Sequence, residues 1–226
     1  WDAGLGQSPA QRLRFVRIED SARQVQNLTR YRIYAADAQE GTTYVFAVWK
    51  IGTYLENMQV FSSSAYVNRK GLLMTRKPTP EEEDQETVDE KAEFDVGVQA
   101  ANGEPLRFVL HTKDNKFIEP GTLIPFPITS ANKGCSLESR LAVPEGQAIL
   151  NYADGFPPNY DLVVRSDSSG ELKESKHTTD DTGHVAFMDL PFVIGRDAGV
   201  LKVTIATKEC SVSTDIPWGK GSYSKH

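Results

Sequence analysis

The sequence predicts an all-β protein made of two tandem, related β-sandwich domains. Along its 226 residues, stretches of four to nine residues alternate apolar and polar side chains, and Gly, Pro, Asn and Asp separate these stretches. Such alternation places one face of a strand against a core, and short strands at close intervals are typical of sandwiches. No stretch of ten or more residues repeats its apolar side chains at the period of a helix.

The first half contains several extended stretches whose patterns differ. We predict strands within residues 12–19, 31–35, 43–51, 58–63, 65–74, 93–100, 105–111 and 117–118. In 12–19 the apolar positions change phase between Phe15 and Val16, which indicates a bulge or a strand that changes sheets. The stretch 43–51 is apolar on both faces, so we expect both faces to be covered.

The second half gives a more regular set of strands. They are predicted at 137–143, 148–152, 160–165, 171–177, 184–188 and 201–206. In the last of these, Leu201, Val203 and Ile205 form a core face opposite Lys202 and Thr204. The class is therefore all-β in this half as well.

Four short motifs of the first half recur in the second, which predicts a duplication. The recurring positions are Asp37 and Asp154, Tyr44 and Tyr160, Gly71 and Gly183, and Ile124 and Ile216, at offsets of 117, 116, 112 and 92. The offset falls from 112 at Gly71 to 92 at Ile124, which indicates about twenty extra residues in the first domain between these positions. We predict a lead-in at 1–11, a first domain at 12–130 with an inserted acidic loop at 78–92, a second domain at 134–219 and a tail at 220–226, with the boundary within 127–134.

A turn motif links the second half to a known kind of module. Thr179, Asp180 and Gly183 precede a strand that carries Val185 and Phe187. Asp can cap such a turn through its side chain, and Gly can adopt the positive φ that the turn requires. The motif resembles the hairpin of bacterial immunoglobulin-like and transthyretin-like β-sandwich modules. The resemblance implies a module that binds, spaces or stabilises, and it implies no active site.

The charge of the chain is concentrated in one tract. Residues 78–91 hold seven acidic side chains and one lysine, so the tract has a net charge of -6, which equals that of the whole chain. A solvated, mobile loop is the expected state, and a loop that collects calcium or a partner is the alternative. No basic stripe with interleaved aromatic residues exists, so we expect no nucleic acid partner.

The two cysteines indicate in which cellular compartment the protein is located. Cys135 and Cys210 form no C-x-x-C motif, and one disulfide between them is the natural pairing in an exported protein. The alternative is two buried thiols in a cytosolic protein. The chain also begins with Trp1 rather than Met, so we expect a periplasmic, cell-surface or secreted protein. No apolar run approaches the ~20 residues that a membrane helix requires.

One cluster of polar residues suggests chemistry. His177, Asp180, Asp181 and His184 lie around the turn and form a candidate metal site, the alternative being an ordinary hairpin with surface histidines. No sequence motif of a hydrolase, a metalloprotease or a nucleotide-binding protein is present, so no cofactor is expected. The sequence leaves open whether residues far apart in the chain assemble into a catalytic site.

Aromatic residues near predicted turns provide the binding hypothesis. Tyr54, Phe156, Tyr160 and Trp218 are candidate contacts for a protein or a glycan, and the alternative is that they close the ends of the sandwiches. These observations lead to two alternative hypotheses about the function. The first is a non-catalytic extracytoplasmic binding or structural protein, and the second is a secreted or periplasmic hydrolase or metal-dependent enzyme that uses the four polar residues.

Overall fold

The computed structural model describes residues 12–18, 29–50 and 59–220, and these residues confirm the all-β prediction. Their regular structure consists of β-strands and one short 3-10 turn, Pro144–Gly146. No helix in these ranges has the length and apolar character to cross a membrane. The predicted lead-in 1–11, most of the predicted tail and Tyr54 lie outside the described residues.

The chain forms two compact units. The first comprises the described residues up to Ala100 together with Pro105–Pro125, and the second comprises Ala101–Glu104 and the residues from Phe126 onward. The predicted boundary at 127–134 is too late, because Ile128–Asn132 is strand β9, which pairs with β10 in the second unit. The backbone of the predicted linker is therefore paired with β10 as part of a sheet.

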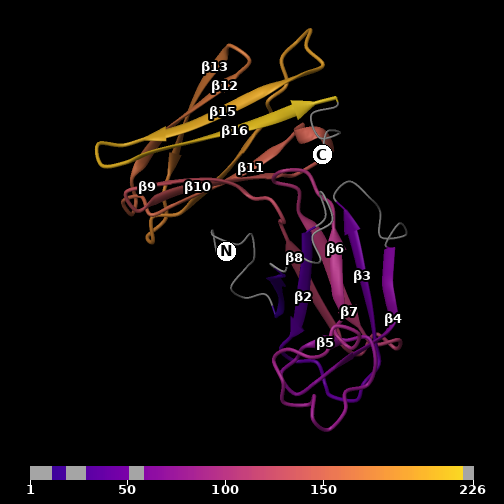
Figure 1. Cartoon of the computed structure of the whole chain (residues 1–226). Helices are drawn as coiled ribbons and strands as arrows, with labels where there is room; N and C mark the ends of the chain where they lie inside the picture. Colours follow the sequence, from indigo (N-terminus) through magenta and orange to yellow (C-terminus); the bar gives the residue numbers. More distant parts are fainter. Residues whose placement is uncertain (1–11, 19–28, 51–58, 221–226) are drawn as a thin grey trace. The chain divides into compact units, whose positions relative to one another are not determined.

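Two antiparallel sheets enclose the core of the first unit (Figure 1). The orders are β1-β2-β6 and β5-β4-β3-β7-β8. Rings from both sheets meet in the core: Phe108 lies 4.8 Å from Phe15 and 5.5 Å from Phe46 between ring centroids. The strands are β1 (Leu13–Arg17), β2 (Thr29–Ala35), β3 (Tyr44–Lys50), β4 (Gln59–Val67), β5 (Leu73–Met74), β6 (Asp95–Val98), β7 (Leu106–His111) and β8 (Ile118–Leu123).

The second unit also consists of two antiparallel sheets (Figure 1). Their orders are β14-β11-β10-β9 and β13-β12-β15-β16. Inward residues alternate with outward ones along β12, as its regular sequence of exposed and buried positions shows. The strands are β9, β10 (Cys135–Leu141), β11 (Ile149–Asp154), β12 (Asp161–Ser168), β13 (Glu171–Thr178), β14 (Val185–Asp189), β15 (Ala198–Ala206) and β16 (Ser211–Gly219).

The two units share one strand order once β5 and β9 are set aside. In each unit the first, second and fifth strands form one sheet: β1-β2-β6 in the first unit and β10-β11-β14 in the second. The fourth, third, sixth and seventh strands form the other sheet in both units. The chain therefore follows the same path twice.

A turn after the fourth strand carries the chain from one sheet to the other in the first unit. The side-chain oxygen of Asn68 accepts hydrogen bonds from the backbone N–H groups of Lys70 and Leu72, at 3.0 and 3.1 Å. The N–H of Gly71 donates to the Asn68 carbonyl, and the Gly71 carbonyl accepts from the N–H of Ala35. The side chain thus replaces ladder partners at the point where the strand leaves its sheet.

The second unit repeats this turn 112 residues later. One side-chain oxygen of Asp180 accepts from the N–H groups of Thr182 and His184, at 2.8 and 2.9 Å. The N–H of Gly183 donates to the Asp180 carbonyl, and its carbonyl accepts from the N–H of Phe156. Gly183 has φ +86°, and a Cβ there would lie 2.1 Å from the Phe156 carbonyl oxygen. Only glycine satisfies both constraints.

The acidic tract lies in the first unit directly after the corresponding turn. Leu72 pairs with Tyr34, so an uninterrupted ladder would pair Arg32 with Met74. Arg32 instead pairs with Asp95, which follows Met74 by 21 residues. These residues are inserted into the strand that in the second unit runs without interruption as β14.

We predict that Gly183→Ala destabilises the second unit by about 3 kcal/mol, because strain at positive φ adds to a clash with backbone. Gly170→Ala is the matched control, since Gly170 also has positive φ but a Cβ added there would have no atom within 4 Å. Its cost should be about 1 kcal/mol. Calorimetry of both variants checks the difference, and equal losses would contradict the packing argument.

Candidate functional site

Asp180, the centre of the predicted metal site, is used by the turn itself. The hydroxyl of Thr182 donates to the same carboxylate oxygen that accepts the two N–H groups, at 2.7 Å. The Thr182 hydroxyl and the N–H groups of His184 and Thr182 lower the pKa of Asp180 to about 2. An oxygen with three donors is a poor ligand for a cation, because its lone pairs are already shared.

The two histidines of the predicted metal site have separate partners. The ring of His177 stacks on Phe187 at 4.8 Å between centroids, and its Nε2 lies 2.9 Å from the Ser175 hydroxyl. Nδ1 of His184 lies 3.0 Å from a carboxylate oxygen of Asp154. Asp181 is exposed in the turn. In the described part of the chain, no group of three or more His, Cys, Asp or Glu residues is arranged to hold a metal ion.

Ser175 and His177 resemble part of a hydrolytic site. They lie two residues apart on β13, an exposed strand at the edge of its sheet. A nucleophilic serine needs a base that a carboxylate orients and donors for the developing oxyanion. Within the described ranges His177 forms no ion pair with a carboxylate. In the described part of the chain, Ser175 and His177 are therefore a pair without the carboxylate of a triad.

Of the three described aromatic candidates, two are interior residues. Phe156 is buried, so the prediction of an exposed contact at this loop was wrong. Its backbone lies against Gly183. Trp218 is buried as well, with its ring against the site where Gly199 has no side chain. Tyr160 is exposed and stays a candidate contact. The two buried rings close the sandwich, which was the alternative for them.

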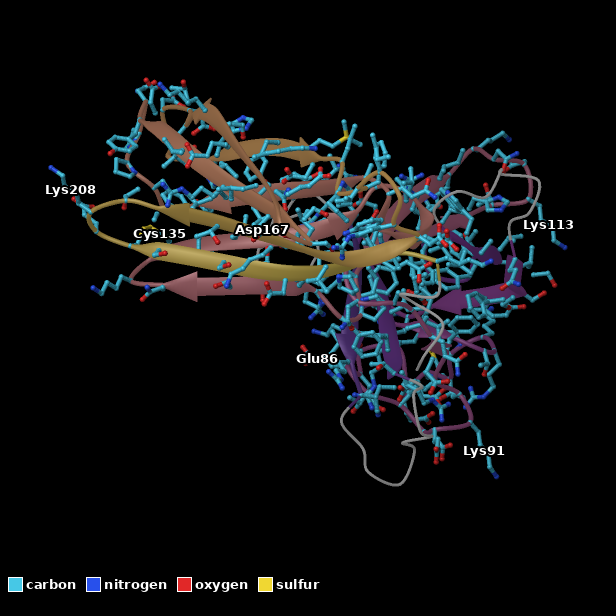
Figure 2. All side chains as sticks on the ribbon, turned by 90° about the horizontal axis from the view of Figure 1, so that it is seen from above. Glu86, Lys91, Lys113, Cys135, Asp167 and Lys208 are labelled. Atoms are coloured by element: carbon cyan, nitrogen blue, oxygen red, sulfur yellow. A yellow bond between two sulfur atoms is a disulfide. The ribbon has the colours of Figure 1, made fainter. Side chains whose placement is uncertain are left out.

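Cys135 and Cys210 form the predicted disulfide. The bond connects the first residue of β10 to the loop between β15 and β16, and therefore joins the two sheets of the second unit. In Figure 2, Cys135 lies toward the end of this unit that carries Lys208.

Hydrogen bonds connect the acidic tract to the first unit. The side-chain amide of Asn68 donates to the carbonyls of Glu82 and Gln85, at 2.9 and 2.8 Å. Arg76 forms two hydrogen bonds with the Glu82 carboxylate, and with the Thr79 N–H it lowers the pKa of Glu82 to about 2. Asn68 thus holds both the turn and the tract, which charge density alone did not predict.

The main feature that the sequence pattern did not predict is an exposed apolar surface on the second unit. β14 ends at Asp189, residues 190–193 have no regular secondary structure, and Ile194 lies in a turn. From His184 to Ile194 the even-numbered residues are exposed, while the odd-numbered residues are buried or half-buried. We call the exposed set the apolar face. It consists of Ala186, Met188, Leu190, Phe192 and Ile194, and the last four are 58%, 53%, 60% and 90% exposed.

The apolar face continues onto the neighbouring strand. Leu150 of β11 pairs with Met188 of β14 and is half-buried on the same side of the sheet. Single exposed apolar residues are ordinary, but a contiguous set of them marks an interaction surface. The signal in the sequence is the run 185–194, VAFMDLPFVI, which has ten residues and one charge.

The other side of this segment is fixed to the interior by a chain of polar side chains. The carboxylate of Asp189 accepts hydrogen bonds from Ser166 and Asn151, both at 2.8 Å. Ser139 donates to Asn151 at 2.7 Å and lies 2.9 Å from the Thr214 hydroxyl. Burial raises the pKa of Asp189. These bonds connect Asp189 of β14 to strands of both sheets.

Comparison with protein-family models gives no match, and comparison with curated proteins gives no related sequence.

We predict that Asp180→Asn preserves the turn at neutral pH, because Asn68 fills the same role in the first unit, whereas Asp180→Ala lowers the melting temperature by several degrees. The depressed pKa means that the carboxylate stabilises the folded state above its unfolded pKa, near 3.9. This contribution disappears as the pH falls through about 2. Thermal melts from pH 7 to 2 should show this loss in the wild type and not in Asp180→Asn. An equal acid dependence of both proteins would contradict the assignment.

We predict that Cys135→Ala/Cys210→Ala destabilises the second unit by about 4.5 kcal/mol, the chain-entropy value for a closed loop of 75 residues. Calorimetry with and without a reductant measures the effect. Reductant should shift the wild type and leave the double variant unchanged, and a loss below about 1 kcal/mol would show that the bond contributes little.

Proposed function

We propose that the chain is a non-catalytic, extracytoplasmic binding protein of two related immunoglobulin-like sandwiches, the second of which binds a protein through its apolar face. The shared strand order supports the relationship between the units. We take β10, β11 and β14 of the second unit as counterparts of strands A, B and E of an immunoglobulin-like fold, and β12, β13, β15 and β16 as counterparts of C, C′, F and G; the strand order supports this correspondence. The disulfide differs from the antibody pattern, since it does not join the second and sixth strands.

The apolar face is the observation that carries this proposal. Its four large side chains are exposed on a segment whose inward residues, including Phe187 and Val193, already fill the core. Exposure of this extent lowers solubility unless a partner covers it. Interface cores are enriched in aromatic residues and Met and depleted of charge, which matches Phe192 and Met188. A protein partner suits this surface better than a glycan, because the face offers few hydrogen-bonding groups.

The disulfide supports an extracytoplasmic location. Bonds of this kind persist in oxidising compartments and are rare in the cytosol. Alkylation of the protein in its native source, before and after reduction, should reveal two cysteines only after reduction. Two reactive thiols in unreduced material would place the protein in a reducing compartment instead.

We predict that a photo-reactive phenylalanine analogue at position 192 forms a cross-link of discrete mass in the native source. The same analogue at position 172 is the control, because Leu172 is 64% exposed on the other sheet of the same unit. Phe192→Asp and Leu172→Asp extend the comparison in a retention assay: the first should reduce partner retention at least tenfold and the second should not. Equal cross-linking from both positions would overturn the proposed binding surface.

A further inference from the structure

Two carboxyl groups of the first unit lie against each other where the acidic tract meets the turn between β2 and β3. Glu83 belongs to the tract and Glu40 to the turn, and their side chains are within hydrogen-bonding distance. Glu83 is only 8% exposed, and no described N–H or hydroxyl group donates to its buried Oε2 atom. Two ionised carboxylates do not stay in such contact, so one of them has to carry a proton that forms the hydrogen bond.

Arg69 decides which of the two carboxyl groups is ionised. Its Nε donates to Glu40 at 2.9 Å, and its Nη1 lies 3.5 Å from the Asp84 carboxylate. The hydrogen bond from Arg69 lowers the pKa of Glu40. Burial, and then the hydrogen bond with Glu40, raise the pKa of Glu83. The proton therefore resides on Glu83, which donates to the ionised Glu40.

The other charged groups around the pair do not remove the need for this proton. Lys77 acts in the same direction as Arg69 and lowers the pKa of Glu40. Asp84 opposes the ionisation of Glu83. Arg69 also favours an ionised Glu83, but its influence is smaller than those of burial and of Glu40.

We propose that Glu83 and Glu40 form a proton-dependent latch, which holds the acidic tract against the turn between β2 and β3 and opens when the proton leaves. The carbonyl of Glu83 accepts from the N–H of Arg69 at 2.9 Å, so the residue that carries the latch is also bound through its main chain. Loss of the proton to solvent leaves two negative charges in contact and a buried oxygen without a donor. The contact then separates, and the hydrogen bond of the Arg69 N–H opens more often. The latch belongs to the first unit and is independent of the function proposed for the second.

A neighbouring attachment of the same tract contains no such proton. Glu82 accepts two hydrogen bonds from Arg76, both at 2.8 Å, and one from the N–H of Thr79 at 2.9 Å. Arg76 and the Thr79 N–H lower the pKa of Glu82 to about 2, so Glu82 stays ionised wherever Glu83 titrates. The tract is thus attached at two adjacent residues, and only the attachment through Glu83 responds to pH.

The direction of the pH effect follows from the raised pKa of Glu83. The folded state binds this proton more strongly than the unfolded chain, in which a glutamate titrates at about 4.3. The stabilisation is fully present below that value and is lost as the pH rises through the folded pKa. The tract is therefore latched in acid, and its attachment weakens toward neutral pH.

Two measurements on the whole chain, between about pH 4 and 8, test the latch. In carbon-13 NMR, the Glu83 carboxyl should titrate above its ordinary value, and Glu40→Gln should lower this midpoint. Hydrogen exchange of the Arg69 N–H, expressed relative to the rate of an unprotected amide, should lose protection about tenfold over the same step. In Glu83→Gln, whose amide donates to Glu40 and does not titrate, the protection should stay constant. The Thr79 N–H is the internal reference, because its acceptor Glu82 stays ionised.

Glu81→Gln is the matched control, because it removes one charge from an exposed position of the same tract. This variant should leave the Glu83 midpoint and the pH dependence of Arg69 exchange unchanged, and circular dichroism confirms that each variant is folded. An ordinary midpoint for Glu83, or constant protection of the Arg69 N–H in the wild type, would overturn the latch. Equal responses of Glu81→Gln and Glu40→Gln, or a parallel loss of protection at Thr79, would overturn it as well, because both outcomes indicate a general loosening of the tract.

Discussion

The turn at the sheet crossing is the constraint on which both units depend. At Asn68 and at Asp180, one side-chain oxygen accepts hydrogen bonds from two backbone N–H groups. The glycine three residues later packs against the last residue of the second strand in the first unit, and against Phe156, two residues beyond that strand, in the second unit. A sandwich needs its chain to leave one sheet and enter the other without losing hydrogen bonds. This turn meets that need within five residues, which explains why it recurs while the residues around it differ.

The segments that come after the turn set the two units apart. In the first unit, 21 residues interrupt the crossing strand, and the acidic tract folds back so that the Asn68 amide also binds its carbonyls. In the second unit the strand continues directly into the segment that carries the apolar face. The same turn is therefore followed by an insertion in one unit and by a segment with exposed apolar side chains in the other.

The sequence predicted the features that depend on local pattern. Alternation identified most of the strands, the Asp180 motif identified the turn, and the two cysteines identified the disulfide. Strands β9 and β16 were not predicted. The burial of Phe156 and Trp218 could not be read from the local pattern either, because it depends on how segments distant in the sequence pack together. Ser139 and Asn151 are polar but lie at core positions. Because the alternating pattern predicts apolar residues at such positions, it gave no sign of the buried hydrogen-bond network that these two residues form.

The apolar face escaped prediction for a related reason. A run such as VAFMDLPFVI is typical of a strand buried on both sides. Here the odd-numbered residues, Phe187 and Val193 among them, suffice for the core, and Asp189 anchors the segment through Ser166 and Asn151. Met188, Leu190, Phe192 and Ile194 are exposed, so their side chains add little to the core of the unit. On β13, the exposed edge strand of the other sheet, charged residues occupy most of the exposed positions instead. The pattern of apolar residues in this run therefore could not show which of them would be exposed.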